Sequence, residues 1–266
     1  MINFFDFESE VEIIEKKIDS LDINQSDDSK IKESLIQKKD QLFKKIYSKL
    51  SPWQKVQVAR HGNRPHTMDY LNIIFDDIIF LYGDKKFADD TAIVGCLAKI
   101  SDTSLMIIGT EKGNSMDTRI KHNFGMAKPE GYRKAQRLMK IAEKFNLPIL
   151  TFVDTAGAFP GKEAEERGQS ESIASSILVS LNVKSPIVSI IIGEGGSGGA
   201  IGLATADKTL MLQHAIYSVI SPEGCASILW RSTDFTQKAA ETLKLTSEDC
   251  YNLKIIDEIV EEIPGG

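Results

Sequence analysis

The sequence has few cysteines, no excess of positive charge and no long apolar run, and each of these shortages excludes a class of protein. Its three cysteines, Cys96, Cys225 and Cys250, are too few and too scattered for a disulfide framework or a Cys/His metal cluster. A net charge of −6 leaves no basic excess for phosphate backbones, which argues against a nucleic-acid partner. No apolar stretch approaches the roughly 20 residues of a membrane-spanning helix, and residues 1–8 lack the pattern of a secretory signal. We therefore expect a cytoplasmic protein with no membrane partner and no metal site in this chain.

What the chain does contain is typical of a folded protein, with 42% hydrophobic and 26% charged residues over a length of 266. Apolar positions recur at helical spacing in residues 11–18 and 31–50, with charged residues between them. This pattern predicts an N-terminal helical arm at residues 1–60 and a main domain at residues 61–266.

Two further helices are expected, one at the end of the arm and one at the start of the main domain. Ser51 and Pro52 are typical of the cap and first residue of a short helix that reaches residue 58. A second helix is expected from Thr67 to Leu81, because its apolar residues are three or four positions apart and Gly83 follows them.

After residue 91 the pattern changes from helical spacing to short apolar runs separated by helices. Continuous apolar strands that alternate with helices predict an α/β domain whose parallel sheet is covered on both faces. The expected elements are a strand pair at 93–97 and 105–108, helices at 129–145 and 163–181, and strands at 147–153 and 187–192.

Two glycine-rich segments, 154–161 and 193–199, follow the two most apolar strands. Ligands of open α/β sheets bind beyond the carboxyl ends of the strands, which is where these segments lie. Glycine lets the main chain approach a ligand closely, and the amides that open a helix have no intrahelical partner. The amides of Gly198 and Gly199 are therefore candidate donors to an oxyanion.

The second segment also matches the dinucleotide-binding fingerprint, through Gly193, Gly195 and Gly198. That fingerprint expects an acidic residue about twenty positions further on, whereas Asp207 comes too early. The match is weak for this reason.

A serine hydrolase is a further interpretation of the same glycines. Gly195, Ser197 and Gly199 have the spacing of a nucleophile elbow, and His214 could act as a base. A glycine run meets this spacing almost automatically, and no carboxylate is marked as the third member. His214 lies in an apolar run that is typical of a core histidine, so the hydrolase stays open as an alternative.

Four longer segments point to one family. They are 154–161, 164–171, 192–200 (IGEGGSGGA) and 217–230 (YSVISPEGCASILW). Together they resemble the alpha subunits of the acetyl-CoA carboxylase carboxyltransferases of the bacterial, multi-subunit type. The resemblance extends from the helical arm to the end of the chain.

The resemblance implies a crotonase-like (ClpP/crotonase) superhelix of ββα units that carries the helical arm. It also implies transfer of a carboxyl group from carboxybiotin, held on the biotin carboxyl carrier protein, to acetyl-CoA. The product is malonyl-CoA, in the first committed step of fatty acid synthesis. Two other interpretations remain: the enzyme could prefer propionyl-CoA, or the chain could act only as a binding module.

In that family the alpha subunit works with a beta subunit in a heterotetramer, beside biotin carboxylase. The beta subunit binds acetyl-CoA and carries the zinc. Carried over to this sequence, Gly198 and Gly199 form the catalytic oxyanion pair for biotin, Gly157 and Ala158 form the facing wall, and Gly195 and Gly196 join the biotin site. Arg167 is expected to form an ion pair rather than to contact a ligand.

Overall fold

The computed structural model describes residues 4–21 and 26–263. The chain divides into two compact units. One contains the described residues up to Ser51 and those from Glu262 onward, and the other is Pro52–Glu261. The first helix after this division, α3 (Pro52–Ala59), belongs to the larger unit, whereas the sequence analysis placed it in the arm.

The smaller unit is a helical hairpin, as the apolar spacing predicts. It contains η1 (Asp6–Glu8), α1 (Ser9–Asp19) and α2 (Ser26–Tyr47). The hydroxyl of Tyr47 donates to Oε1 of Glu8 at 2.7 Å, and this carboxylate also accepts from the Phe5 amide. The Tyr47 bond joins the end of α2 to the residue that precedes α1, 39 positions away in the sequence. The buried apolar residues of α1 are Val11, Ile14 and Ile18.

The expected helix 67–81 is wrong in its second half. Helix α4 (Thr67–Ile74) stops early, and β1 (Asp76–Phe80) follows it as an edge strand that pairs with the next strand. Ile78 and Phe80 are half-buried while Ile79 is 60% exposed, so the burial alternates with a period of two. The spacing of these apolar residues fits a helix as well as a strand, and pairing with β2 selects the strand.

The larger unit is built on one mixed, eight-stranded sheet. Its first three strands are antiparallel neighbours, which confirms the expected strand pair, and the remaining pairings are parallel. The order is β1-β2-β3-β4-β5-β6-β8, with β7 paired to β5. The strands after β1 are β2 (Ile93–Ile100), β3 (Thr103–Thr110), β4 (Ile149–Thr155), β5 (Ile187–Gly196), β6 (Lys208–Leu212), β7 (Ile216–Ser218) and β8 (Glu258–Val260).

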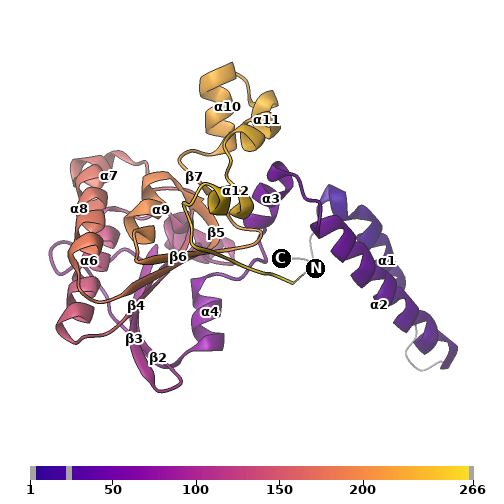
Figure 1. Cartoon of the computed structure of the whole chain (residues 1–266), viewed down its shortest axis with the longest axis horizontal. Helices are drawn as coiled ribbons and strands as arrows, with labels where there is room; N and C mark the ends of the chain where they lie inside the picture. Colours follow the sequence, from indigo (N-terminus) through magenta and orange to yellow (C-terminus); the bar gives the residue numbers. More distant parts are fainter. Residues whose placement is uncertain (1–3, 22–25, 264–266) are drawn as a thin grey trace. The chain divides into compact units, whose positions relative to one another are not determined.

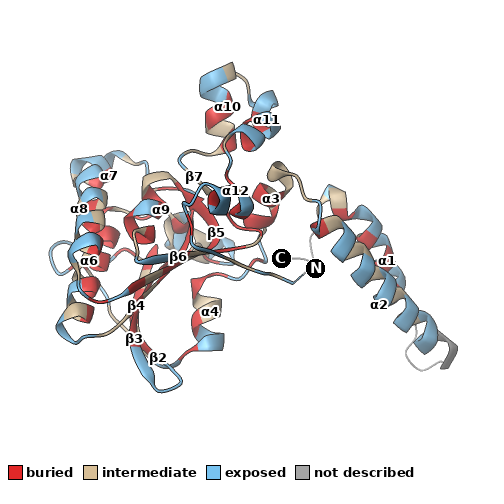
Figure 2. Ribbon diagram, in the orientation of Figure 1, coloured by how far each residue is buried: buried red, intermediate tan, exposed pale blue. Residues whose placement is uncertain are grey.

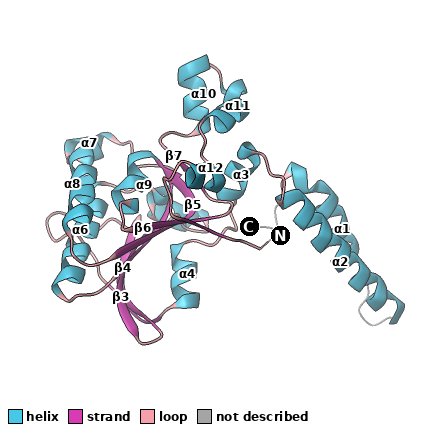
Figure 3. Cartoon of the chain, in the orientation of Figure 1, coloured by secondary structure: helices cyan, strands magenta, loops and turns pink. Residues whose placement is uncertain are grey.

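Helices lie on both sides of this sheet, as Figure 1 and Figure 3 show. The helix expected over 163–181 is interrupted, because Gly168 has a φ of +80° that ends one helix and begins the next. The helices of this unit after α4 are α5 (Met116–Lys121), η2 (Asn123–Gly125), α6 (Pro129–Lys144), α7 (Lys162–Glu166), α8 (Gln169–Asn182), α9 (Ser197–Ala204), α10 (Pro222–Trp230), η3 (Thr233–Phe235), α11 (Thr236–Thr242) and α12 (Ser247–Asn252).

Both faces of the sheet are covered, as expected. The hydroxyl of Thr151 donates to the Leu203 carbonyl of α9, whereas its neighbour Phe152 stacks on Tyr70 of α4 with ring centroids 5.6 Å apart. Successive residues of a strand point to opposite faces, so α9 and α4 lie on opposite sides of β4. Figure 2 shows the buried residues concentrated on these central strands.

Candidate functional site

The two glycine-rich segments emerge next to each other at the carboxyl ends of neighbouring strands. Strand β4 ends at Thr155, which is paired with Gly195 of β5. The chain after Thr155 and the chain after Gly196 therefore leave the same edge of the sheet. This is the position that the sequence analysis predicted for the site.

Two glycines allow the segments to touch. A Cβ on Gly196 would lie 2.2 Å from the carbonyl oxygen of Ala156, and one on Gly199 would lie 2.4 Å from the carbonyl carbon of Gly157 and 2.6 Å from the Ala158 nitrogen. Contacts this short do not occur for real side chains. The structure thus brings Gly157 and Ala158 against Gly199, where the sequence analysis expected them to form a facing wall.

The strand that leads into the second segment is longer than expected. Strand β5 was expected to end at residue 192, but it continues to Gly196, and Gly195 and Gly196 pair with Tyr217 and Ser218 of β7. A Cβ on Gly195 would lie 2.9 Å from Cδ2 of Tyr217. The structure therefore gives Gly195 and Gly196 a packing role at the end of the sheet.

Helix α9 opens directly after these strand residues. Its first-turn amides, which include those of Gly198 and Gly199, have no acceptor within the helix. Gly198 is half-buried, and a Cβ there would meet Ile173 only at an ordinary 3.7 Å. Space does not require glycine at this position, in contrast to Gly196 and Gly199.

Ser197 stands at the turn from β5 into α9 with a φ of +53°. Few residues other than glycine adopt this conformation, and a nucleophile elbow also strains its serine. His214, the base considered for a hydrolase, is 2% exposed and lies in the turn between β6 and β7. The structure thus places it among the buried residues, as expected for a core histidine.

A buried ionic cluster, which the sequence analysis missed, is built around Asp154 and Glu194 at the starts of the two segments. The Asp154 carboxylate receives Lys112 Nζ at 2.6 Å, the Glu194 amide at 2.8 Å and His66 Nδ1 at 3.4 Å. Burial by itself would raise the pKa of the Asp154 carboxyl, but Lys112 and these hydrogen bonds hold that pKa well below its usual value. Asp154 is therefore a carboxylate at neutral pH.

A second ion pair extends this cluster to the end of α3. Arg60 Nη2 lies 2.6 Å from Oε1 of Glu194, and its Nη1 lies 2.7 Å from Oε1 of Glu223. Glu194 is 6% exposed, so this guanidinium neutralises a buried carboxylate. In the sequence, the only local indication of this ion pair was Glu194 itself, an acidic residue at the end of a buried strand.

The cluster borders a pocket of about 210 Å³, which we call the cationic pocket. Asp154 and Glu194 line it from the ends of β4 and β5. Its remaining charged or titratable lining includes Arg60, His66, Lys112 and Arg119, and Ala156 of the first glycine-rich segment also contributes to it.

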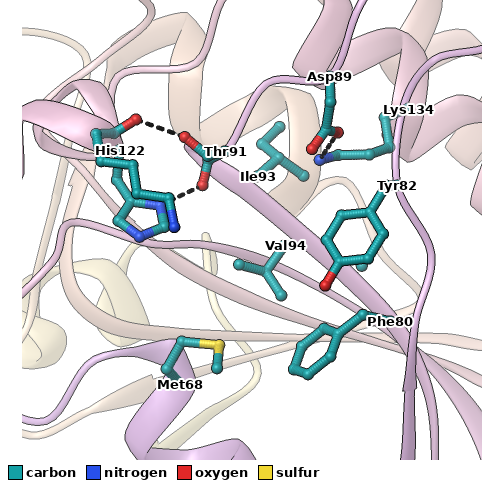
Figure 4. A pocket seen from close by; sticks show the side chains of 11 residues that line it. Met68, Phe80, Tyr82, Asp89, Thr91, Ile93, Val94, His122 and Lys134 are labelled. Atoms are coloured by element: carbon teal, nitrogen blue, oxygen red, sulfur yellow. Dashed lines mark hydrogen bonds and ion pairs between the residues drawn. The ribbon is translucent and has the colours of Figure 1, made fainter. Parts of the chain in front are cut away.

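Another pocket, of about 220 Å³, lies away from the glycine-rich segments (Figure 4). Met68, Phe80 and Val94 form an apolar side, and the Lys134 ammonium is already paired with Asp89 at 2.5 Å. None of the predicted site residues lines this pocket.

The expected ion pair of Arg167 is confirmed, since its Nη2 lies 2.9 Å from Oε1 of Glu130.

Within residues 4–21 and 26–263, no three His, Cys, Asp or Glu side chains gather in a way that could hold a metal ion. Across that same part of the chain, no helix combines the length and the apolar character needed to cross a membrane.

Comparison with known sequences gives consistent matches over the whole chain. Residues 4–266 match the family described as "Acetyl co-enzyme A carboxylase carboxyltransferase-like". The "Acetyl-coenzyme A carboxylase carboxyl transferase subunit alpha" of Paramagnetospirillum magneticum is 55% identical over 272 residues, covering 100% of this chain and 85% of the relative. Proteins of the same name from Rhodospirillum centenum and Rhizobium meliloti are 54% and 52% identical, and 100% of this chain aligns with 85% and 86% of them.

Solved structures confirm the crotonase-type α/β fold. A transcarboxylase 12S chain, solved with methylmalonyl-coenzyme A and methylmalonic acid bound, superposes with a TM-score of 0.65 at 17% identity, over 77% of this chain and 40% of that chain. The beta subunit of geranyl-CoA carboxylase from P. aeruginosa gives a TM-score of 0.62 at 17% identity, over 79% and 42%. The fold, the meeting of the two glycine-rich segments and the full-length sequence matches agree, and the chain belongs to the acetyl-CoA carboxylase carboxyltransferase family.

Proposed function

We propose that this chain is the alpha subunit of a cytoplasmic acetyl-CoA carboxylase carboxyltransferase. Together with a beta subunit, it transfers the carboxyl group from carboxybiotin on the biotin carboxyl carrier protein to acetyl-CoA, giving malonyl-CoA. The observation that carries this proposal is the agreement of name among relatives more than 50% identical across the whole chain. The glycine-rich segments in contact at the ends of β4 and β5 support it with a suitable site.

The proposed task of the site is to stabilise negative charge. Carboxybiotin supplies the carboxylate that is transferred, and the amides of Gly198 and Gly199 donate to the biotin ureido oxygen as it becomes anionic. A donor aimed at developing charge is worth about 2.7–4 kcal/mol in the transition state. Gly157 and Ala158 form the opposite wall, held there by the absence of a side chain on Gly199.

Gly195 and Gly196 take a supporting part in this proposal. Their pairing with β7 and their close contacts with Tyr217 and Ala156 fix where β5 ends. The end of β5 in turn sets the first turn of α9, where the donor amides lie. Gly195 and Gly196 therefore contribute to the biotin site by positioning the donor amides of α9.

The chain needs partners because carboxyl transfer creates two anions, one on biotin and one on acetyl-CoA, and each requires its own set of donors. The beta subunit supplies the second set, binds acetyl-CoA and carries the zinc. Two alpha and two beta subunits form the working enzyme, and biotin carboxylase reloads the carrier protein.

The test is a carboxyltransferase assay in the reverse direction, with malonyl-CoA and biocytin. The chain is assayed alone, with its beta partner, and with the partner alone as the control. We expect turnover only when both subunits are present. Turnover by the isolated chain, or none with a competent partner, would contradict the proposal.

Two additional arms of the same assay address the alternatives. Faster turnover of methylmalonyl-CoA than of malonyl-CoA would identify propionyl-CoA as the preferred acceptor. Incubation with a fluorophosphonate tests the hydrolase, because covalent labelling at Ser197 would require an activated serine.

A further inference from the structure

The cationic pocket contains more positive than negative charge. Its lining carries three basic side chains, Arg60, Lys112 and Arg119, against the two carboxylates of Asp154 and Glu194. The lining therefore carries one more cation than carboxylates, and a further carboxylate, Glu223, binds Arg60 from outside the lining.

That excess can be assigned to one residue. Arg60 binds Glu194 and Lys112 binds Asp154, so both carboxylates already have a cation. Arg119 forms no ion pair with the described residues, and its Nε donates only to the Gly113 carbonyl at 3.2 Å. A half-buried guanidinium in this state is available to an anion.

His66 provides a second, independent indication of a ligand. Its ring lines the pocket with 6% of its surface exposed, and Nδ1 lies 3.4 Å from Asp154 Oδ2. Its other ring nitrogen, Nε2, is buried and has no hydrogen-bond partner among the described residues. A buried polar atom without a partner is rare in native proteins, and a ligand oxygen would satisfy it.

We propose that the cationic pocket binds a phosphate group, with one oxygen at His66 Nε2 and another at the Arg119 guanidinium. The polar groups come from four separate places in the chain, namely the end of α3, the start of α4, the segment after β3 and helix α5. A tetrahedral group presents oxygens to several walls at once, whereas a planar carboxylate presents two. The proposal uses neither Gly198 nor Gly199 and holds whether or not the carboxyltransferase function does.

Binding of inorganic phosphate to the full chain tests this, followed by calorimetry and by broadening of the ³¹P resonance. The variants are Arg119→Gln and His66→Gln. The matched control is Arg137→Gln, because Arg137 Nε also donates to a glycine carbonyl, that of Gly83 at 2.9 Å, but lies outside the pocket. We expect about tenfold weaker binding for Arg119→Gln, a clear loss for His66→Gln and no change for the control.

Absence of phosphate binding, equal binding by Arg119→Gln and the natural chain, or acetate that competes as well as phosphate would each overturn the proposal. If His66→Gln does not fold, Arg119→Gln still decides, since its side chain is only half-buried. Competition by coenzyme A and by dephospho-coenzyme A then separates the sources. Stronger competition by coenzyme A identifies a nucleotide 3′-phosphate, equal competition by both identifies the diphosphate that they share, and competition by neither identifies free phosphate.

Discussion

Lys112 Nζ lies 2.6 Å from Asp154 Oδ1, and only 3% of the aspartate side chain is exposed. Asp154 opens the first glycine-rich segment, and its carboxylate also accepts the Glu194 amide and so joins the ends of β4 and β5. A buried charge pair that holds two strand ends together makes stability depend on the ionisation of Asp154.

We expect Asp154→Asn to lower the free energy of unfolding by about 3–5 kcal/mol at pH 7, because Lys112 would lose its buried partner. The folded-state pKa of Asp154 lies below the unfolded value of about 3.9, so its contribution is complete above that value and declines as the pH falls below it. Urea unfolding of both proteins between pH 3 and pH 7 measures this. The difference should be constant from pH 7 to 5 and shrink towards pH 3.

The control for this measurement is Asp77→Asn, which removes the exposed pair with Lys99. Surface pairs contribute little, so its stability should follow that of the natural chain at every pH. A difference for Asp154→Asn that does not vary between pH 3 and pH 7 would contradict the assignment.

Gly199→Ala should destabilise the chain by about 1–3 kcal/mol and remove carboxyl transfer, because the new methyl group would collide with the main chain of Gly157. Gly198→Ala is the matched control, since its methyl group meets Ile173 at an ordinary distance. It should leave stability unchanged or raise it by up to about 1 kcal/mol. Thermal unfolding and the reverse assay check both variants, and a Gly199→Ala protein with normal activity would show that the two segments need not touch.

Gly198→Pro tests the amide rather than the space. Proline removes the N–H and is tolerated in the first turn of a helix, so the variant differs from Gly198→Ala in the donor itself. If this amide stabilises the anion, kcat should fall by roughly 10²–10³ relative to Gly198→Ala. A folded Gly198→Pro protein, judged by circular dichroism, with the kcat of Gly198→Ala would exclude Gly198 as a donor.

The thiols give a prediction independent of the site. Burial raises the pKa of Cys96 and of Cys250 to about 12, so neither forms an appreciable thiolate at pH 8. Ellman's reagent should therefore modify at most one thiol in the native chain, at Cys225, and all three after denaturation. Rapid modification of two or more native thiols would contradict the buried positions.

The sequence was most informative where a local pattern has one structural solution. Apolar runs that alternate with helices predicted the four strands β2 to β5 and the helices between residues 129 and 181, and the glycine-rich segments after two of these strands predicted the edge where the site lies. It failed at residues 76–80, whose apolar spacing fits a helix as well as a strand until pairing with β2 is known. Gly168 divided an expected helix for a similar reason, since its effect depends on a local φ that spacing alone does not reveal.

The ionic cluster could not be predicted from any local pattern. Arg60 and Glu194 are 134 positions apart, and His66 and Asp154 are separated by 88. Only the order of strands in the sheet brings such residues together. Lys112, Asp154 and Glu194 were each visible as charged residues near strand ends, but nothing in their spacing indicated which of them would meet.

The glycine run has a consequence for how variants of this protein would be interpreted. Added side chains at Gly193, Gly195, Gly196 and Gly199 would meet Asp154, Tyr217, Ala156 and Gly157 respectively, so each glycine is held by a different neighbour. A saturation mutagenesis screen would report an almost unbroken intolerant stretch that resembles a catalytic signature. Most of that intolerance would come from crowding between strands and loops. Only at Gly198, where a side chain has room, would the effect of substitutions on activity report on catalysis.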